Sequence, residues 1–220
     1  MRILIVAATE FEVFSLKSEV ESLKNNRDLR LRTFDFQLLI TGVGMVATAY
    51  ALGRELATNS YDLAINLGIA GSFDRNIALG DIVEITEDNI AELGAEDNEA
   101  FLPISQMGFG ESNFTATKPL NEIYTDAKLK QATAITVNTV HGHEASIQKI
   151  QQRLNPQIES MEGAAFFYAC GEAEVPSLQI RAVSNYVEKR NRDAWQIGLA
   201  IKNLNTFAVA LLESLNVARL

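Results

Sequence analysis

The stretch IESMEGAAFFYACGEAEVPSLQIRAVSN, residues 158–185, decides how the rest of the chain is interpreted. A carboxylate, Glu162, stands at the start of a small and apolar run that predicts a helix. An apolar strand is then predicted from Leu178 to Val183, and it is followed by Ser184 and Asn185. In open parallel α/β sheets, ligands bind outside the carboxyl ends of the strands. The stretch therefore predicts that Glu162 and Asn185 face one small-molecule pocket.

Apolar runs typical of buried strands alternate with helix-like segments on both sides of this stretch. We expect strands at 3–7, 36–40, 63–67, 81–85 and 134–137, and helices from Thr9, at 46–57, at 145–154 and at 193–215. Neither an internal repeat nor a linker interrupts the alternation. It predicts one α/β domain over residues 1–220 with a largely parallel sheet.

Composition and charge narrow the classes of function. The 220 residues carry a formal charge of −9, which argues against a nucleic-acid partner, since phosphate binding needs clustered Lys and Arg. Cys170 is the single cysteine and lies in an apolar run, so it predicts a buried thiol in a reducing compartment. Neither a signal-peptide layout nor an apolar run of about 18 residues is present. We expect a soluble cytoplasmic protein that does not enter a membrane.

Periodicity fades between Asn89 and Lys118, where Gly, Asn, Ser and acidic residues dominate. Such a long irregular stretch in a compact domain indicates either a functional loop or elements that the pattern fails to reveal. Both interpretations stay open at this point.

Glu12 has two interpretations. With Thr9 as N-cap, Glu12 three residues later completes a capping box. Alternatively, the carboxylate follows the first strand, where crevices form, and can hold and deprotonate a water molecule. Glu162 also has two interpretations. Either its carboxylate is stabilised by the dipole of the helix that follows it, or its two oxygens accept hydrogen bonds from vicinal hydroxyls of a ligand.

The only two histidines, His141 and His143, stand in Val-His-Gly-His-Glu. A His-x-His pair without further spaced ligands is a weak zinc signal, and contact of a histidine with a ligand is at least as good an interpretation. No metal and no cofactor is expected.

Five motifs in register give the chain a resemblance to the purine nucleoside phosphorylase and nucleosidase superfamily, in its hydrolytic branch. In chain order they are Ala8-Thr-Glu-Phe-Glu12, Thr41-Gly-Val-Gly44, Asn66-Leu-Gly-Ile-Ala-Gly71, Met161-Glu-Gly-Ala-Ala165 and Arg181-Ala-Val-Ser-Asn185. The resemblance implies a three-layer α/β/α sandwich with a central mixed, largely parallel sheet. It also implies a homodimer or higher homo-oligomer.

Residue roles follow from the same resemblance. Glu12 would activate the attacking water and Glu162 would bind the ribose hydroxyls, with Met161 beneath the sugar. Three further residues would contact the substrate: Gly71 beside the anomeric carbon, Ser184 at the purine edge and His141 against the base.

Asn185 departs from the adenosine-type enzymes of this superfamily, which carry Asp at that position. A neutral amide cannot protonate purine N7, but it can donate to N7 or to a 6-oxo group. An adenine amino group facing this donor would leave a buried polar group unsatisfied, at a cost of about 1–3 kcal/mol. Asn185 therefore favours a 6-oxopurine such as hypoxanthine as the base. The same side chain is a candidate for stabilising the leaving base.

Hydrolysis is favoured over phosphorolysis, because the loop Ala7–Glu10 has no cation for phosphate and Asn66 stands where the phosphorylases carry Arg. Together with Ser184-Asn-Tyr-Val187, these features resemble most the futalosine hydrolase group, which releases hypoxanthine in menaquinone biosynthesis. We expect the acid end of such a substrate near residues 89–118, in a pocket that a second subunit can complete, and Arg190 and Arg192 are the candidate cations. The alternatives are a methylthioadenosine/S-adenosylhomocysteine nucleosidase, a purine nucleoside phosphorylase and a non-catalytic nucleoside-binding protein.

Overall fold

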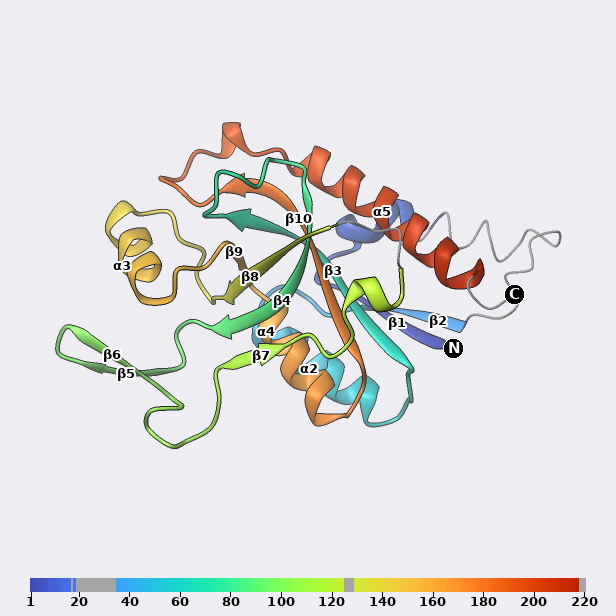
Figure 1. Cartoon of the computed structure of the whole chain (residues 1–220), viewed down its shortest axis with the longest axis horizontal. Coiled ribbons are helices and arrows are strands. Elements are labelled where there is room, and N and C mark those ends of the chain that lie inside the picture. The colour runs from blue at the N-terminus through green and yellow to red at the C-terminus, as the bar shows by residue number, and fades with distance from the viewer. Residues whose placement is uncertain (17, 19–34, 125–128, 218–220) are drawn as a thin grey trace.

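One mixed sheet runs through the protein and closes on itself over part of its width (Figure 1). The computed structural model describes residues 1–16, 18, 35–124 and 129–217. Strand β1 (Arg2–Ala7) pairs in parallel with β2 (Asp35–Ile40) and with β3 (Leu63–Ser72), and β3 pairs in parallel with β10 (Ser177–Tyr186). From β10 the pairing continues through β4 (Ile82–Ile90), β8 (Lys130–Thr136) and β9 (Ile158–Ser160), and β9 returns to β3.

The predicted α/β class with a mixed, largely parallel sheet is confirmed, but two local predictions are wrong. The strand expected at 63–67 continues as β3 through the glycine-containing segment 68–72, and the short strand β9 had no predicted counterpart. Both errors concern the part of the sheet that closes into a ring, which no local pattern in the sequence indicates.

Both faces of the sheet are covered by helices, as the continuous burial of β1 requires. Ile3 and Ile5 belong to one apolar cluster, with residues of α5 (Ile197–Val217), whereas Leu4 and Val6 belong to a second cluster. The second cluster includes side chains of α2 (Met45–Leu56) and α4 (Gly163–Glu172). In Figure 1, α5 lies on the opposite side of the sheet from α2 and α4.

Helix α5 packs with one stripe of buried residues at helical spacing: Ala200, Leu204, Ala208, Leu211 and Leu215. Asn205 beside this stripe is also buried, and its amide binds a distant segment. Its Nδ2 donates to the carbonyl of Glu12 (2.8 Å) and its Oδ1 accepts from the N–H of Leu16 (2.8 Å). Helix α5 thereby fixes the backbone that carries Glu12.

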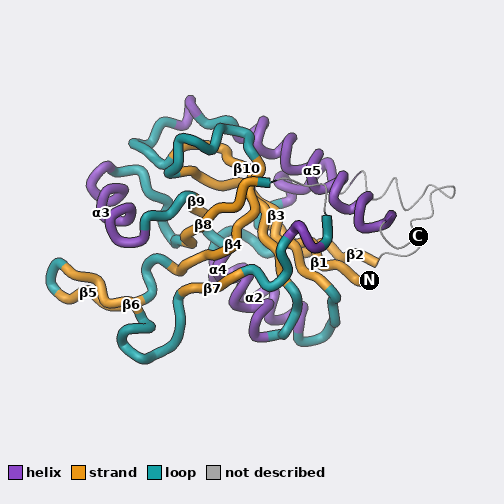
Figure 2. The backbone as a smooth tube through the Cα atoms, viewed as in Figure 1, coloured by secondary structure: helices purple, strands orange, loops and turns teal. Residues whose placement is uncertain are grey.

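Residues 89–118 contain three strands that the sequence pattern did not reveal. Strands β5 (Gly94–Asp97) and β6 (Ala100–Pro103) form a hairpin that projects from the main sheet (Figure 2), and β7 (Asn113–Thr115) pairs with β4. Each of these strands has only three or four residues, which is too short to be distinguished from a loop.

The remaining helices differ from prediction mainly at their ends. The helix expected from Thr9 begins as the 3-10 turn η1 (Glu10–Val13), and the apolar residues Val20 and Leu23 further along this segment lie outside the described residues. Helix α3 (Glu144–Leu154) matches, whereas α5 begins at Ile197 after the short turn η4 (Arg192–Ala194). A further 3-10 turn, η3, spans Leu120–Glu122.

Cys170 is buried in α4, as predicted, and burial raises the pKa of its thiol to about 12. Among the helices of the described residues, none has the length and apolarity needed to cross a membrane.

Candidate active site

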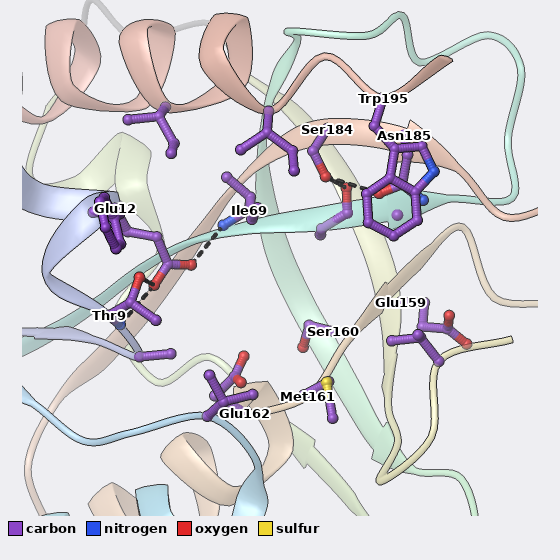
Figure 3. Close-up of a pocket in the computed structure, with 18 of the residues that line it drawn as sticks. Thr9, Glu12, Ile69, Glu159, Ser160, Met161, Glu162, Ser184, Asn185 and Trp195 are labelled. Carbon is purple, nitrogen blue, oxygen red and sulfur yellow. Dashed lines mark hydrogen bonds between the residues drawn. The ribbon is translucent and has the colours of Figure 1, made fainter. Parts of the chain in front are cut away.

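A pocket of about 570 Å³ lies where β1, β3 and β10 reach their carboxyl ends (Figure 3). All seven residues singled out from the sequence line it: Glu12, Gly71, His141, Met161, Glu162, Ser184 and Asn185. The tertiary structure therefore brings together segments that are up to 173 positions apart in the chain, from Glu12 to Asn185. In Figure 3, Glu12 lies at one end of the pocket and Asn185 with Trp195 lies at the other.

Glu12 enters the pocket from turn η1, directly after β1. Its Oε2 accepts hydrogen bonds from the backbone N–H (2.9 Å) and the hydroxyl (3.1 Å) of Thr9, as in a capping box. Its Oε1 accepts from the N–H of Ile69 in β3 (3.1 Å). The capping box is therefore present, and the same carboxylate also lines the pocket, whereas activation of a water molecule by Glu12 stays a prediction.

Burial raises the pKa of the Glu12 carboxyl above its ordinary value. The positive charge of Arg181 and the N–H groups of Ile69 and Thr9 act against this rise, and the negative charge of Glu162 adds to it. A carboxylate with a raised pKa is a stronger base than an ordinary one, which suits abstraction of a proton from water.

Glu162 stands immediately before α4 and is 6% exposed. Its Oε1 accepts from the backbone N–H of Gly44 (3.0 Å). Gly44 has φ of 96°, a left-handed conformation that favours glycine and turns its N–H toward the carboxylate. The other oxygen, Oε2, lies 3.7 Å from Nη1 of Arg181.

Arg181 is a buried cation beneath the pocket that sequence reasoning did not single out. It is 1% exposed, its Nε donates to Oε1 of Gln179 (2.8 Å) and its Nη2 donates to Oδ1 of Asn66 (2.5 Å). The available signal was the polar pair Gln179 and Arg181, two residues apart and so on one face of an apolar strand. A Cβ at Gly68 would lie 2.1 Å from Nη1 of Arg181, so Gly68 serves the close approach of this side chain and not a turn.

The network extends from Arg181 to a fully buried carboxylate, Asp88. Nε2 of Gln179 donates to Oδ2 of Asp88 (3.1 Å), and the hydroxyl of Thr136 donates to Oδ1 (2.8 Å). Burial raises the pKa of Asp88 to about 6, while the two hydrogen bonds and Arg181 oppose the rise. The strand faces beneath the pocket therefore carry polar side chains that are joined by hydrogen bonds.

Substitution of Gly163 by alanine tests how tightly this network is packed. A Cβ there would lie 2.1 Å from Oδ2 of Asp88 and 2.2 Å from Oε1 of Gln179. We expect Gly163→Ala to lower the free energy of unfolding by about 3 kcal/mol, because overpacking costs about 1–3 kcal/mol and buried hydrogen bonds are lost as well. Urea unfolding measures this change. Gly171→Ala in the same helix is the control, since no described residue outside its own helix lies within 4 Å of the added Cβ, and it should not destabilise the protein.

Ser184 and Asn185 both line the pocket because β10 is irregular at this point. Neighbouring residues of a strand normally face opposite sides of a sheet. Here the register with β3 shifts between Val183 and Asn185, which makes Ser184 the extra residue of a bulge. The hydroxyl of Ser184 donates to Oδ1 of Asn185 (2.8 Å), and Nδ2 of Asn185 donates to the carbonyl of Tyr186 (3.1 Å).

His141 is held by Glu159, a pocket residue that sequence reasoning missed. Glu159 is 4% exposed and accepts from the backbone N–H of His141 (2.9 Å), and its other oxygen forms a short contact with Nδ1 of the ring. The ring also lies edge-to-face against Phe73, at 6.3 Å between ring centroids. His141 is therefore fixed in orientation from two sides.

The two candidate cations for an acidic group of the substrate, Arg190 and Arg192, differ in their position relative to the pocket. Arg190 lines the pocket and its guanidinium stacks over Trp195, at 5.1 Å from the ring centroid, whereas Arg192 is not among the lining residues. None of the residues 89–118, all of which the structure describes, lines this pocket. Within one chain this segment does not reach the pocket, since the hairpin β5–β6 projects away from the sheet (Figure 2). Its contact with the acid end of the substrate stays a prediction.

Comparison of the sequence with known proteins identifies the family of this chain. The sequence model of the phosphorylase superfamily matches residues 2–215. The chain is 35% identical to a futalosine hydrolase of Streptomyces coelicolor over 176 residues, which cover 77% of this chain and 75% of that protein. It is 29% identical to a futalosine hydrolase of Thermus thermophilus over 206 residues, 91% of each chain.

Among solved structures, a 5′-methylthioadenosine/S-adenosylhomocysteine nucleosidase of Colwellia psychrerythraea in complex with adenine superposes with a TM-score of 0.78. The identity is 24%, and the match covers 98% of this chain and 96% of that one, which shows a shared fold. With a family match along nearly the whole sequence and a curated relative at 35% identity, the chain belongs to the phosphorylase superfamily, in the group that includes the futalosine hydrolases.

Proposed function

We propose that this protein hydrolyses the N-glycosidic bond of futalosine and releases hypoxanthine. The observation that carries the proposal is the pocket itself, which has a carboxylate of raised pKa, Glu12, at one end and a neutral amide, Asn185, at the other. The relatives named as futalosine hydrolases support the choice of substrate.

In the proposed mechanism, Glu12 holds a water molecule and accepts its proton as the water attacks the anomeric carbon. Glu162 accepts hydrogen bonds from the ribose hydroxyls, Met161 packs against the sugar, and Gly71 lines the pocket beside the reacting carbon. Positive charge develops on the sugar in the transition state, and both carboxylates stabilise it.

Base recognition is assigned to the bulge of β10. Asn185 has a second N–H besides the one bonded to Tyr186, and we propose that it donates to the 6-oxo group or to N7 of the base. Ser184, bonded to Oδ1 of Asn185, keeps the amide in this orientation.

Charge supports hydrolysis over phosphorolysis. Within the described part of the chain, the guanidinium nearest to Glu162 belongs to Arg181, which already binds Asn66 and Gln179. Glu12 and Glu162 would repel a phosphate ion at this end of the pocket.

The direct experiment incubates the purified protein with futalosine, inosine or methylthioadenosine, with and without phosphate, and measures the released base. We expect hypoxanthine from futalosine at a rate independent of phosphate. Release of adenine from methylthioadenosine with no hypoxanthine from futalosine would support the nucleosidase alternative, and phosphate-dependent turnover would contradict the proposed hydrolysis.

Arg190 is the proposed partner of the carboxylate at the far end of the substrate, with Trp195 beside it. We expect Arg190→Ala to raise KM for futalosine about 10-fold with little change in kcat, because a lost charge-assisted hydrogen bond costs about 1.5–3 kcal/mol. Inosine, which lacks the acid, should show an unchanged KM. Arg192→Ala is the control, since Arg192 does not line the pocket. Equal effects of the two substitutions would contradict this assignment.

Several properties of the whole protein belong to the same proposal. We propose a single cytoplasmic nucleosidase domain over residues 1–220, with a three-layer α/β/α arrangement where α2 and α4 face α5 across the sheet. A homodimer is proposed as well, supported by exposed apolar side chains next to the pocket: Phe11, Val43, Val46 and Tyr50.

A further inference from the structure

The pair His141 and Glu159 occupies the end of the pocket where Asn185 lies. Asn185 of β10 pairs with Gly71 of β3, and Gly71 pairs with Glu159 of β9, so the three residues form one row across adjacent strands. With about 4.8 Å between neighbouring strands, the Cα atoms of Asn185 and Glu159 are about 10 Å apart. Gly71 between them has no side chain. The side chains of Asn185 and Val187 cover Gly71, because an added Cβ there would lie 3.2 Å from Nδ2 of Asn185 and 2.9 Å from Cγ2 of Val187. Asn185 and the pair His141–Glu159 therefore line the pocket from the two outer strands of this row.

The proposed reaction requires a proton at this end of the pocket. When the bond between the anomeric carbon and the purine breaks, the electron pair stays on the base, and a proton on a ring nitrogen neutralises it. Asn185 has no proton to release, because an amide donates hydrogen bonds but does not ionise. Glu12 and Glu162 lie toward the other end of the pocket, on the side assigned to water and ribose (Figure 3).

His141 is the group whose chemistry meets this requirement. Its Nδ1 is engaged by Glu159, so the ring nitrogen left for a ligand is Nε2. As imidazolium, His141 carries a transferable proton on Nε2. Glu159 is almost fully buried, and within the described part of the chain its carboxylate bonds to two N–H groups of His141, the backbone one and the ring one. A buried carboxylate directed at one histidine fixes the tautomer and the ring plane, as in other histidine–carboxylate pairs.

We propose that His141 is the general acid that protonates the leaving purine and that Glu159 is its positioning residue. The role of His141 rests on the proposed function, and it supplies the second proton transfer of the proposed hydrolysis. The oxygen of water bonds to the anomeric carbon, one proton of that water goes to Glu12, and the carbon–nitrogen bond breaks with its electron pair on the base. The base takes the proton of Nε2. Exchange with solvent then returns Glu12 to carboxylate and His141 to imidazolium, so that one water is consumed overall.

The test compares His141→Gln with His143→Gln in the full-length protein. Glutamine keeps a polar side chain that can bond to Glu159 but has no transferable proton. His143 is exposed at the start of α3 and does not line the pocket. We expect His141→Gln to lower kcat about 100-fold, at the lower end of the range for a positioned general acid, with little change in KM. The His143→Gln protein should behave as wild type.

A pH profile separates acid catalysis from a structural role. Two charged residues of the described part of the chain adjoin His141: Glu159 on β9, and Arg190, whose backbone N–H bonds to the carbonyl of Gly142. In the wild type, kcat should decline on the alkaline side because the reaction needs a proton donor at the base, and this decline should be absent from His141→Gln. Persistence of the decline in the variant, a loss confined to KM, or a kcat within about 3-fold of wild type would each overturn the proposal.

Glu159→Gln tests the positioning residue. If Glu159 acts only through His141, the double variant Glu159→Gln/His141→Gln should be no slower than His141→Gln alone. A further loss in the double variant would contradict a role through His141. If Glu159→Gln does not fold, the His141→Gln result decides the proposal by itself. If the wild-type protein releases no hypoxanthine from futalosine, the proposed substrate fails, and the same variants are measured on whichever nucleoside the protein cleaves.

Discussion

The Glu12→Gln protein is expected to hydrolyse futalosine about 1,000-fold more slowly than wild type while still binding hypoxanthine. The amide cannot accept a proton from water, so the attacking nucleophile is no longer activated. The base site at Asn185 lies at the other end of the pocket and should remain intact (Figure 3). Single-turnover assays measure the loss, and titration with hypoxanthine measures the retained binding.

Glu10→Gln is the matched control, since Glu10 is exposed in the same turn and should have no effect on the rate. The amide that Glu12→Gln introduces also places an N–H group against one of the two backbone donors, from Thr9 and Ile69, which costs about 1–3 kcal/mol of stability. Urea unfolding therefore accompanies the rate measurements. Activity of Glu12→Gln within about 10-fold of wild type would leave Glu12 with its capping role alone.

The pH dependence follows from the state that Glu12 needs for catalysis. Because it acts as a carboxylate, activity should fall as the pH falls through its pKa. Burial raises that pKa, so the acid limb of kcat/KM should lie above the value of about 4.3 that an ordinary glutamate would give. In Glu12→Gln this limb should disappear.

The Arg181→Met protein is expected to lose about 3–5 kcal/mol of unfolding free energy at pH 8. Methionine replaces the volume but leaves two buried carboxylates, Glu12 and Glu162, without their cation, and removes the hydrogen bonds to Asn66 and Gln179. Because Arg181 lowers the pKa of Glu12, that pKa should rise further in the variant. Urea unfolding at pH 8 and pH 5 measures both effects.

The loss of unfolding free energy in Arg181→Met should depend on pH in one direction. In the variant the ionised carboxylates are penalised in the folded state, and protonation removes the penalty, so the loss should be smaller at pH 5 than at pH 8. Arg75→Met is the control: Arg75 pairs with Glu188 at 2.5 Å and stacks on Tyr186, but its side chain is 61% exposed. It should cost at most about 1 kcal/mol at either pH. Equal losses for Arg181→Met and Arg75→Met would contradict the buried-network interpretation.

The sequence by itself determined the class of fold and most of the residues of the site. Continuous apolar runs such as 3–7 and 63–67 fit strands buried on both faces, and the structure buries them so. Glu12, Glu162 and Asn185 follow or precede such elements, and the rule that ligands bind at the carboxyl ends of strands was enough to predict that they meet. The choice of Asn at 185 is chemical information that needs no structure to interpret.

Only the tertiary structure decided which partners these residues have. The bulge that turns both Ser184 and Asn185 into the pocket depends on the register between β10 and β3, and the pairing of Glu159 with Gly71 depends on the closure of the sheet through β9. Arg181 reaches Glu162 because Gly68, more than a hundred positions away, has no side chain. Local periodicity reports the faces of one segment, whereas these contacts depend on the relative register of segments distant in sequence, and a shift of one residue would exchange their faces.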